Sequence, residues 1–598
     1  MILIFGGTTE GRLAASVLDK AGVPFFYSTR DGLQQLVLAN GTAVSGGLDR
    51  EGIVEFCRAR GIRLIVDAAH PFAESLHANI SEASRELGVP VVRYERRYPP
   101  RDTRCVWCAG FTDAIGMMRR DGVSRLLALT GVQTIGKLSP FWRETPTWFR
   151  ILDRRESRIL AEEKGFPVSR LVFYKDDGDI QECLEEIAPD AVLTKESGES
   201  GGFALKASQA LDAGIAVYVV ERPRLPGSFI TVDGPVGLRK AVERLVPGFY
   251  SLRSGFTTGS CATAAAKGAL ISLLDGEPCE EVAITLPGGE TFRFQLEDCV
   301  VEAGYASATV VKDAGDDPDV TDGCRITATV MINGKGVIRF LKGEGVGVVT
   351  LRGLGLEVGE PAINPVPRRM MTSELMSLSP AGCDVTISVA DGASIAAKTF
   401  NPKVGVIGGI SIIGTSGVVM PFSHEAFMES IKREMEVAVA AGCRTLVLNS
   451  GARSEKAVRK AYRELPDLAF IHYGNAVGDT VALASEFDLD GVAVGLMIGK
   501  AVKLAEGNLD THSHKVVFNR EFLCRVALEA GCSSAMIGII RRMALARELW
   551  DSDEADADRF FPALLRLCRE HCRRLLPATP LILILIDDSL HLRYTLDS

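Results

Sequence analysis

Two glycine-rich turns are the first candidates for chemistry in this sequence. One reads GGTTEGR at residues 6–12, directly after an apolar segment, and the other reads GFTTGS at residues 255–260. Each comes just before a stretch of small, helix-forming residues. In such an arrangement the free backbone N–H groups and the positive end of the helix face an anionic ligand. Two starts of this kind predict two enzymes joined in one chain.

The first turn is a candidate dinucleotide site, although it lacks the full GxGxxG spacing, and a tight turn without a ligand is the alternative. Arg30 stands where the second strand is expected to end, the place where such a site reads the ribose. An arginine there suits a 2′-phosphate and favours NADPH over NADH, although the neighbouring Asp31 weakens this preference. His70 follows the third expected strand at the same edge, where a histidine is either a structural hydrogen-bonding residue or a substrate contact.

Three further clusters lie in the second half of the chain. Residues 313–319 place four carboxylates after an expected strand, which is a candidate metal-binding loop. They lack the twelve-residue calcium pattern with its closing Glu, so polar ligand contacts and an acidic turn are the alternatives. Residues 405–419 form a glycine-rich segment suited either to close approach by a ligand or to a tightly packed crossing. His512 and His514 have HxH spacing without a clear third ligand, so a hydrogen-bonding loop is expected and no resident metal is predicted.

The elements that must position these residues alternate between short apolar segments and helical patterns over the first 245 residues. This βαβ pattern indicates parallel sheets covered on both faces, whose ligands bind at the carboxyl ends of the strands. The expected strands are residues 1–5, 23–28, 64–67, 89–93, 125–129, 191–194 and 216–220.

A boundary between two halves is expected at residues 244–253, where a Pro-Gly pair interrupts the pattern. An alanine-rich helix at 262–274 follows, with Thr258 or Ser260 as its candidate N-cap. The predicted fold class is a multidomain protein that combines α/β and α+β parts. We expect an N-terminal half of two Rossmann-like parallel-sheet subdomains, 1–125 and 126–246, and a C-terminal half of an α+β subdomain and an open α/β subdomain, 252–395 and 396–598.

Composition limits the classes of function. The 598 residues predict roughly three or four domains. Because 46% of the residues are hydrophobic and the net charge is −9, the chain indicates a core-forming protein without a nucleic-acid partner. No basic segment precedes the apolar residues 2–5, and no apolar run approaches the ~20 residues that span a bilayer, so a cytoplasmic protein without a membrane partner is expected.

Cysteines and arginines give weaker signals. The 14 cysteines are scattered, and the CxxC at 105–108 and the pair Cys568 and Cys572 have no second pair at zinc-site spacing, so buried or surface thiols are expected. A local cluster of arginines at positions 93, 96, 97 and 101 is a candidate for holding a polyanionic small molecule.

Taken together, the N-terminal motifs resemble the precorrin-6A reductase family of cobalamin biosynthesis. The resemblance covers residues 1–246 and is carried by GGTTEGR, by DAAHPFA at 67–73, by TG at 130–131 and by TKESGESGG at 194–202. It implies an NAD(P)H-dependent enzyme that reduces one double bond of a corrin-precursor macrocycle. The implied cofactor contacts are Gly6, Gly7, Thr8, Thr9, Arg12, Arg30, Thr130 and Gly131, and the implied residues of the interdomain cleft are His70, Lys195, Ser197 and Gly198, with His70 as a candidate proton donor and catalytic residue.

The C-terminal motifs resemble the cobalt-precorrin-5B methyltransferase family that methylates C-1. They are GFTTGSCATAAAKGAL at 255–270, KDAGDDPDVTDG at 312–323, NPKVGVIGGISIIGTSGVVMPFS at 401–423 and IGKAVKLAEGNLDTHSHK at 498–515. This family uses S-adenosylmethionine without the usual methyltransferase glycine motif. The implied contacts near the donor are Gly414, Thr415 and Ser416. The resemblance also implies contacts with the donor or the macrocycle by Thr257, Thr258, Lys500, Asp316, Asp317 and His512. Of these, the candidate catalytic residues are Asp316, Asp317 and His512.

Both resemblances together predict a bifunctional enzyme. It would methylate cobalt-precorrin-5B and then reduce the product, and any cobalt would arrive inside the tetrapyrrole substrate. Joining consecutive steps raises the local concentration of the intermediate. At 173–178 the chain reads FYKDDG, whereas relatives often have a Gly-Pro-Phe-Ser turn, so a second hypothesis keeps the N-terminal half as a tetrapyrrole-binding module without reduction. A general nucleotide-binding carrier is a third, and the sequence leaves open whether the chain forms a homo-oligomer.

Overall fold

The computed structural model describes residues 1–598 except 31, 33–35, 175–178, 513–516 and 598. It forms two compact units. The N-terminal unit comprises Met1–Leu252 with the short segment Gly288–Thr291, and the C-terminal unit comprises Arg253–Pro287 with Phe292–Ser598. The altered turn noted at 173–178 falls mostly outside the described residues, and His514 lies outside them.

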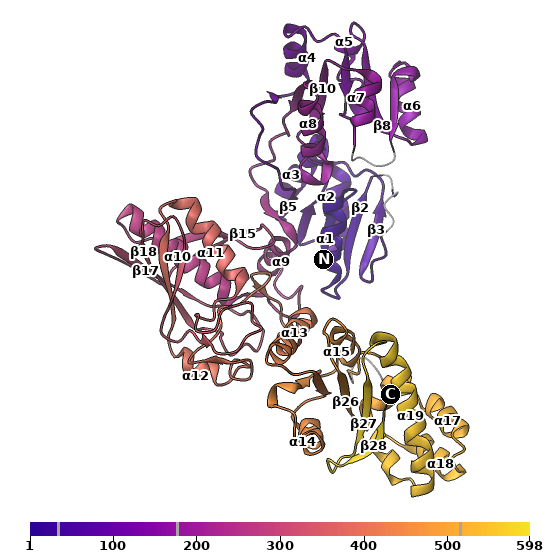
Figure 1. Cartoon of the computed structure of the whole chain (residues 1–598). Helices are drawn as coiled ribbons and strands as arrows, with labels where there is room; N and C mark the ends of the chain where they lie inside the picture. Colours follow the sequence, from indigo (N-terminus) through magenta and orange to yellow (C-terminus); the bar gives the residue numbers. More distant parts are fainter. Residues whose placement is uncertain (31, 33–35, 175–178, 513–516, 598) are drawn as a thin grey trace. The chain divides into compact units, whose positions relative to one another are not determined.

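The first sheet of the N-terminal unit has six parallel strands. Its strands are β1 (Ile2–Phe5), β2 (Phe25–Thr29), β3 (Gly41–Ser45), β4 (Leu64–Asp67), β5 (Val91–Glu95) and β12 (Ile230–Asp233), and its helices are α1 (Thr9–Asp19), α2 (Arg50–Arg60), α3 (Glu74–Leu87) and α9 (Gly234–Leu245) (Figure 1). The strand order is β12-β5-β4-β1-β2-β3. The chain therefore runs outward from β1 to β3 and returns on the other side of β1, which places the crevice of an open α/β sheet between the carboxyl ends of β1 and β4.

The second sheet also has six parallel strands, in the order β6-β11-β10-β7-β8-β9. Its strands are β6 (Val106–Cys108), β7 (Leu126–Ala128), β8 (Thr147–Leu152), β9 (Leu171–Tyr174), β10 (Ala191–Lys195) and β11 (Ala216–Val220), and its helices are α4 (Phe111–Arg120), α5 (Ser139–Trp142), α6 (Arg155–Glu163), α7 (Gln181–Ile187) and α8 (Phe203–Asp212). Short 3₁₀ turns lie at Val132–Thr134, Val168–Arg170 and Glu199–Gly201.

One edge strand of the first sheet, β12, follows all strands of the second sheet in the sequence. The chain leaves β5 of the first sheet and next adds β6 to the second sheet, beside β11. After completing the second sheet it returns and adds β12 to the first sheet, beside β5. The first sheet is thus completed only after the second, which consists of the consecutive strands β6 to β11.

The first part of the C-terminal unit is an α+β arrangement around the sheet β16-β17-β18-β21-β19. Two helices, α10 (Thr258–Asp275) and α11 (Pro365–Leu378), pack together, and α10 also packs on this sheet. Because α10 is rich in alanine and glycine, it is buried along most of its length. The remaining elements are β13 (Gly255–Phe256), β14 (Glu281–Thr285), β15 (Thr291–Gln295), β16 (Asp298–Glu302), β17 (Tyr305–Val311), β18 (Arg325–Ile332), β19 (Arg339–Lys342), β20 (Val348–Val349), β21 (Cys383–Val389), α12 (Gly392–Ala396), β22 (Val406–Ile407) and β23 (Val418–Val419).

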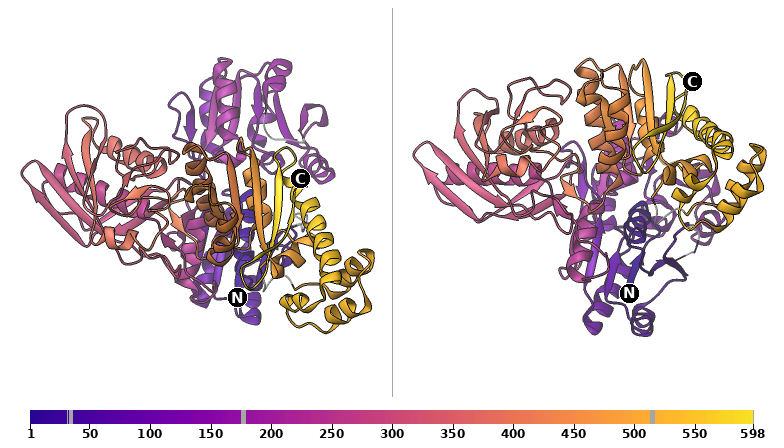
Figure 2. Two further views of the ribbon diagram at one scale, coloured as in Figure 1. Left: turned by 60° about the horizontal axis from the view of Figure 1, so that its bottom comes forward. Right: turned by 90° about the horizontal axis from the view of Figure 1, so that it is seen from below.

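The second part of the C-terminal unit is an open α/β sheet in the order β25-β24-β26-β27-β28, with helices on both faces (Figure 2). The first four strands are parallel and β28 is antiparallel. Its elements are α13 (His424–Ala440), β24 (Thr445–Asn449), α14 (Ala452–Ala461), β25 (Phe470–His472), α15 (Val477–Ala484), β26 (Gly491–Met497), α16 (Ile498–Ala505), α17 (Arg520–Glu529), α18 (Ser534–Arg542), α19 (Glu554–Leu575), β27 (Leu581–Ile586) and β28 (Leu592–Leu596), with 3₁₀ turns at Asp467–Ala469 and Ala546–Asp551.

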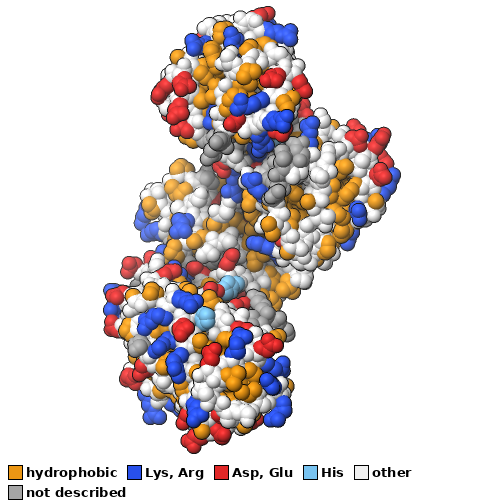
Figure 3. Space-filling view, turned by 90° about the vertical axis from the view of Figure 1, so that its right-hand side faces the viewer, with side chains coloured by type: hydrophobic (Ala, Val, Ile, Leu, Met, Phe, Trp, Pro, Cys, Tyr) orange, Lys and Arg blue, Asp and Glu red, His pale blue; other side chains and the backbone are white. Residues whose placement is uncertain are grey.

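This architecture confirms the predicted fold class, with parallel sheets in the N-terminal half and a mixed sheet arrangement in the C-terminal half. Among the described residues, every helix is too short or too polar to cross a bilayer. On the face in Figure 3, Lys and Arg side chains are intermingled with Asp and Glu side chains.

Candidate functional site

A cavity of about 910 Å³ opens at the carboxyl edge of the first sheet in the N-terminal unit. It lies where the order of the strands reverses, between the turns that follow β1 and β4. Six of the residues singled out from the sequence line it, namely Gly6, Gly7, Thr8, Arg12, Arg30 and His70. Other lining residues that the sequence analysis missed are Gly46, Gly47, Phe72, Gln133, Lys137 and Arg154.

The glycine turn after β1 is shaped for close approach of the backbone to a ligand. A Cβ on Gly6 would lie 2.2 Å from the hydroxyl of Tyr27, so only glycine fits there. Gly7 has φ +91, and a Cβ on it would meet no atom within 4 Å, so its backbone borders open space. The hydroxyl of Thr8 accepts from Gly11 N at 2.9 Å and donates to Ala68 O at 2.7 Å. Thr8 therefore caps α1 and joins the turns after β1 and β4.

The cavity carries several cationic side chains. Arg12 projects from the first turn of α1, and its guanidinium donates to the hydroxyl of Thr9 at 3.0 Å. Thr9 itself is not a lining residue, and its observed role is to hold Arg12. Arg30 comes directly after β2, and Arg154 and Lys137 come from the segments around the second sheet. Guanidinium groups beside a helix N-terminus are suited to phosphate groups.

His70 stands in the turn between β4 and α3. Its Nδ1 accepts a hydrogen bond from Phe72 N at 3.2 Å. Burial, followed by the nearby cations Lys195 and Arg96, lowers the pKa of His70 to about 3. The ring is therefore neutral over the range of pH in which enzymes normally work.

A buried ionic network lies beneath this turn. Arg93 is 1% exposed, and its guanidinium donates to Asp67 Oδ1 at 3.0 Å and to Ala69 O at 2.9 Å. His77 places Nδ1 2.7 Å from Asp67 Oδ2 and Nε2 3.1 Å from the carbonyl oxygen of His70. The network thus fixes the backbone on both sides of His70 from inside the protein.

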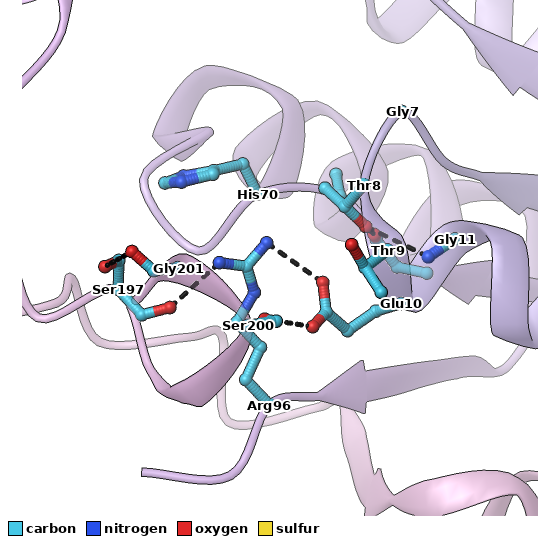
Figure 4. Close-up of polar contacts among 12 residues, drawn as sticks. Gly7, Thr8, Thr9, Glu10, Gly11, His70, Arg96, Ser197, Ser200 and Gly201 are labelled. Carbon is cyan, nitrogen blue, oxygen red and sulfur yellow. Dashed lines mark hydrogen bonds and ion pairs between the residues drawn. The ribbon is translucent and has the colours of Figure 1, made fainter. Parts of the chain in front are cut away.

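A second network joins the two sheets of the N-terminal unit (Figure 4). The guanidinium of Arg96 donates to Ser197 O at 2.8 Å and pairs with Glu10 Oε2 at 2.9 Å. Glu10 in turn accepts from the hydroxyl of Ser200 at 2.5 Å. Glu10 lies in the first turn of α1, while Ser197 and Ser200 follow β10. The nucleotide-type turn and the loop after β10 are therefore connected through Arg96.

Three residues predicted for the interdomain cleft lie at the end of β10 and in the loop after it, namely Lys195, Ser197 and Gly198, and none of them lines the cavity. The Lys195 ammonium lies 5.2 Å from the centre of the Phe72 ring, which is a lining residue. Gly198 has φ +74, and a Cβ there would lie 2.8 Å from Arg97 O. Lys195 therefore borders the cavity through Phe72, whereas Ser197 and Gly198 pack against Arg96 and Arg97.

Thr130 and Gly131 also lie outside the cavity lining. Thr130 is 1% exposed, and its hydroxyl is 2.6 Å from that of Thr134. Gly131, at φ +83, leads into the 3₁₀ turn Val132–Thr134, and the lining residues Gln133 and Lys137 follow from it. Their observed role is to shape the segment that reaches the cavity.

The four arginines of the predicted cluster each lie near a carboxylate of the protein, and Arg97 is the most loosely placed, 4.0 Å from Asp233. Arg93 pairs with Asp67, and Arg96 pairs with Glu10, as described above. Arg101 pairs with Glu221 at 2.9 Å and with Glu196 at 3.4 Å. The carboxylates of the protein thus already pair with these guanidinium groups.

In the C-terminal unit, the second glycine-rich turn meets the glycine-rich segment 405–419. β13 pairs with β23 in antiparallel register. The hydroxyl of Thr258 accepts from Ile413 N at 2.9 Å, and that of Ser260 donates to Gly417 O at 2.7 Å. The N-cap of α10 is Thr257, because its hydroxyl accepts from Ser260 N at 3.2 Å, so both predicted candidates, Thr258 and Ser260, were wrong. Two motifs that are far apart in the sequence thus form one structure.

A cavity of about 550 Å³ borders this structure, and Thr415 is one of its lining residues. Arg369 and Glu374 of α11 line it as well. Glu374 is 8% exposed, pairs with Lys267 at 2.6 Å and accepts from Thr285 N at 2.6 Å. The buried carboxylate is therefore neutralised by the protein itself and fixes one wall of the cavity.

The acidic loop 313–319 makes internal contacts. Asp316 accepts from Arg253 N at 2.7 Å, and Asp317 accepts from Phe422 N at 3.2 Å. Asp319 pairs with the buried Lys312 at 2.9 Å. Within the described part of the chain, no three His, Cys, Asp or Glu side chains gather as a group that would hold a metal ion.

Lys500 and His512 belong to the open sheet of the C-terminal unit. Lys500 lies in the first turn of α16, and its ammonium donates to Gly474 O at 2.7 Å and to Asn475 Oδ1 at 2.6 Å. Burial, together with the neighbouring Lys503, lowers the pKa of Lys500 to about 8. His512 N donates to Asp510 Oδ1 at 3.1 Å. Lys500 follows β26, and His512 lies in the loop after α16, where Thr511 N donates to Asn475 O at 2.9 Å. Gly414, Thr415 and Ser416 lie in the α+β part.

The cysteines at the two candidate pairs are buried thiols. Cys105 and Cys108 are buried and free. Cys568 and Cys572 are also buried and free, and burial raises the pKa of Cys572 to about 12. This agrees with the expectation of ordinary thiols.

Comparison with known proteins relates each of these two units to a protein family. Residues 1–241 match the sequence profile of the family described as precorrin-6x reductase CbiJ/CobK, residues 248–421 match that of CbiD, and residues 510–593 match that of the CbiD C-terminal domain. The cobalt-precorrin-5B C(1)-methyltransferase of Prosthecochloris aestuarii is 46% identical over 345 residues, which is 56% of this chain and 94% of that protein. The chain belongs to the cobalt-precorrin-5B C(1)-methyltransferase family.

Two further relatives extend the comparison. The cobalt-precorrin-5B C(1)-methyltransferase of Geobacillus kaustophilus is 42% identical over 53% of this chain and 87% of that protein. A solved structure of the CobK precorrin-6A reductase is similar over 41% of this chain and 97% of that chain, at 23% identity and a TM-score of 0.35. The chain therefore joins a reductase-family part to its methyltransferase-family part, and both resemblances noted in the sequence are confirmed.

Proposed function

We propose that the C-terminal unit transfers a methyl group from S-adenosylmethionine to C-1 of cobalt-precorrin-5B, and that the N-terminal unit then reduces the product, cobalt-precorrin-6A, with NADPH or NADH. Residues 1–246 would form the reductase and residues 252–598 the methyltransferase. The methyltransferase is supported by the identity to relatives over most of their length. The observation that carries the reductase is the single cavity that gathers Gly6, Arg12, Arg30 and His70.

The residues around this cavity fit a nicotinamide dinucleotide. Its volume of about 910 Å³ lies within the usual range for small-molecule sites. Gly7 provides a backbone cradle, and the N-terminus of α1 with Arg12 would hold the pyrophosphate. Arg30 at the end of β2 would hold a 2′-phosphate, which favours NADPH over NADH. The nicotinamide ring, when bound, supplies the hydride.

The chain's own part in reduction would be to hold the reacting faces together and to exclude water. The turn of His70 and Lys195 at the end of β10 border the same cavity from the two sheets. We assign the macrocycle to this side, where Lys195 would meet one of its carboxylates. Arg96, which links the two sheets, keeps both walls in place.

Methyl transfer would use the structure formed by Thr257, Thr258 and the segment Gly414 to Ser416. Transfer to an electron-rich carbon is an in-line displacement at the sulfonium, so alignment of the reacting atoms to about 3–3.5 Å matters more than a strong base. The cavity of about 550 Å³ beside Thr415 is in the range of a small-ligand site, which fits S-adenosylmethionine. Asp316, Asp317, Lys500 and His512 remain proposed contacts of the donor or macrocycle.

The test is to incubate the purified chain with cobalt-precorrin-5B and S-adenosylmethionine and to follow the product mass before and after NADPH or NADH is added. A gain of one methyl group followed by two hydrogens supports both activities. Methylation that stops there leaves the N-terminal unit as a binding module. No methylation of an intact substrate overturns the proposal.

A further inference from the structure

The two ring nitrogens of His70 have different roles, since Nδ1 is hydrogen-bonded within its own turn and Nε2 is the nitrogen that can donate to a ligand. Nδ1 accepts the N–H of Phe72 at 3.2 Å, so Nδ1 carries no proton. A neutral imidazole then has its hydrogen on Nε2, which is a donor only. The residue lines the cavity of the N-terminal unit, and in Figure 4 its ring points away from Thr8. The structure thus presents a single N–H donor at this wall.

The surroundings oppose a proton on Nδ1. Cations come from both sheets: Lys195 ends β10, Arg93 lies within β5, and Arg96 directly follows β5. The carboxylates that face this region are already used, since Glu10 pairs with Arg96 and Asp67 with Arg93. Glu74 also lines the cavity, but its side chain is 58% exposed and pairs with Lys137 at 3.8 Å. A second proton on His70 would therefore add a positive charge beside carboxylates that already pair with cations.

The turn itself is held rigidly. His77 lies between two oxygen atoms of this turn, with Nδ1 2.7 Å from Asp67 Oδ2 and Nε2 3.1 Å from the carbonyl oxygen of His70. Asp67 also accepts from Ala69 N at 3.1 Å, and Arg93 donates to Ala69 O. These bonds fix the backbone at residues 69 and 70 and therefore the direction of the His70 ring.

We propose that His70 acts in reduction as a neutral hydrogen-bond donor, giving its Nε2–H to an oxygen of the cofactor or macrocycle, and is not the acid that supplies the proton. Asp67 and His77 are positioning residues that hold its turn. The acceptor would be either the carboxamide oxygen of the nicotinamide or an oxygen of a macrocycle side chain. The proton that completes the reduction then comes from water or another acid. This inference rests on the proposed reductase function.

The test uses the full chain with His70→Gln, His70→Asn and His70→Ala, and His591→Gln as the control. A glutamine amide nitrogen reaches about as far as Nε2 and donates a hydrogen bond, but it does not release a proton at neutral pH. We expect His70→Gln to keep kcat for reduction within about tenfold of the parent, and His70→Ala and His70→Asn to lose about ten- to a hundredfold. His591 is largely exposed, at 70% of its side chain, so its variant should match the parent.

A fall of His70→Gln to the level of His70→Ala overturns the proposal. So does a pH profile of kcat in the parent with a limb near neutral pH that disappears in all three His70 variants. NADPH affinity identifies the acceptor: weaker binding in His70→Ala places it on the cofactor, and unchanged binding with lower kcat places it on the macrocycle. The positioning role of Asp67 and His77 is tested with His77→Gln, which should lower kcat for reduction without shifting the pH profile of kcat. A shifted profile would contradict that role.

A readout without turnover separates this idea from the proposed function. In spectra of the chain with ¹⁵N-labelled histidine, assigned by comparison with His70→Gln, Nδ1 of His70 should stay unprotonated from neutral pH down to mild acid. Titration of this nitrogen near pH 6.5, the usual value for histidine, overturns the inference even if reduction occurs. If the parent reduces nothing, the proposed function fails while this measurement still decides the state of His70.

Discussion

Thr257 and Gly414 are far apart in the sequence, yet a Cβ on Gly414 would lie 2.3 Å from the Thr257 hydroxyl oxygen. Thr257 uses the same hydroxyl to cap α10 through Ser260 N. The start of the central helix and the glycine-rich segment are therefore packed so closely that only glycine fits between them. This contact joins the two motifs that the family resemblance implied for the donor site.

Gly414→Ala should damage the C-terminal unit more than a glycine substitution in open space. The new Cβ would clash with Thr257 and would also adopt φ +139, which L-residues rarely occupy. Gly408→Ala is the matched control, because Gly408 has φ +83 but no atom within 4 Å of a Cβ. We expect backbone strain to lower the free energy of unfolding by about 1–3 kcal/mol in both variants. Overpacking should lower it by about 1–3 kcal/mol more in Gly414→Ala. Urea denaturation measures this, and equal losses would contradict it.

Glu10→Gln should destabilise the N-terminal unit. The side chains of Glu10 and Arg96 are 9% and 7% exposed, so removing the carboxylate charge leaves a buried guanidinium without its partner. The expected loss in free energy of unfolding is about 3–5 kcal/mol. Glu51→Gln, in the first turn of α2 and exposed, is the control and should change stability by no more than about 0.5 kcal/mol. Similar losses in the two variants would show that the network does not stabilise the unit.

His70 should make the protein sensitive to acid. Burial and the cations Lys195 and Arg96 lower its native pKa to about 3, against an ordinary value of 6.5. Between these values the unfolded chain binds more protons than the native one, so the free energy of unfolding falls as the pH drops below 6.5, by about 1.4 kcal/mol per pH unit for one proton. His70→Gln should lose less stability than the parent over this range. A difference between parent and variant that stays constant with pH would refute the prediction.

Lys500 should change the free energy of unfolding at alkaline pH. Burial and Lys503 lower its native pKa to about 8, against an ordinary value of 10.5. The native state thus binds fewer protons than the unfolded state between pH 8 and 10.5, and the free energy of unfolding rises with pH there. Lys500→Gln should lack this rise, whereas Lys456→Gln on the exposed side of α14 should keep it. Parallel denaturation series in alkaline buffers would show whether the two variants differ.

The sequence predicted those parts of the fold that depend on continuous apolar segments. β1, β4 and β10 lie where they were expected, because each is a short run of buried apolar residues followed by a polar turn. β8 was missed, since Thr147–Leu152 contains Trp148 and Arg150, which form cation–π contacts on its faces and hide the apolar pattern. β6 was missed because a three-residue edge strand leaves almost no periodic signal.

The candidate site could be predicted only in part, for a physical reason. Residues directly after strands, such as Gly6, Arg30 and His70, meet at one cavity because parallel strands share a carboxyl edge. Gln133 and Arg154 reach the same cavity from the second sheet, and nothing local in the sequence marks that approach. The partners Glu10 with Arg96 and Asp67 with His77 were also missed, because pairing between distant side chains has no sequence period.

The addition of β12 to the first sheet after the whole second sheet has a consequence for how the chain is made. A ribosome that has released residues 1–225 has produced five strands of the first sheet and all six of the second, while β12 is still to come. Until then the outer side of β5 is an unpaired strand edge, which is a surface prone to pairing with other chains. Nascent chains of this protein are thus exposed to aggregation while the second sheet is being made, and a truncation before residue 230 would leave that edge permanently open.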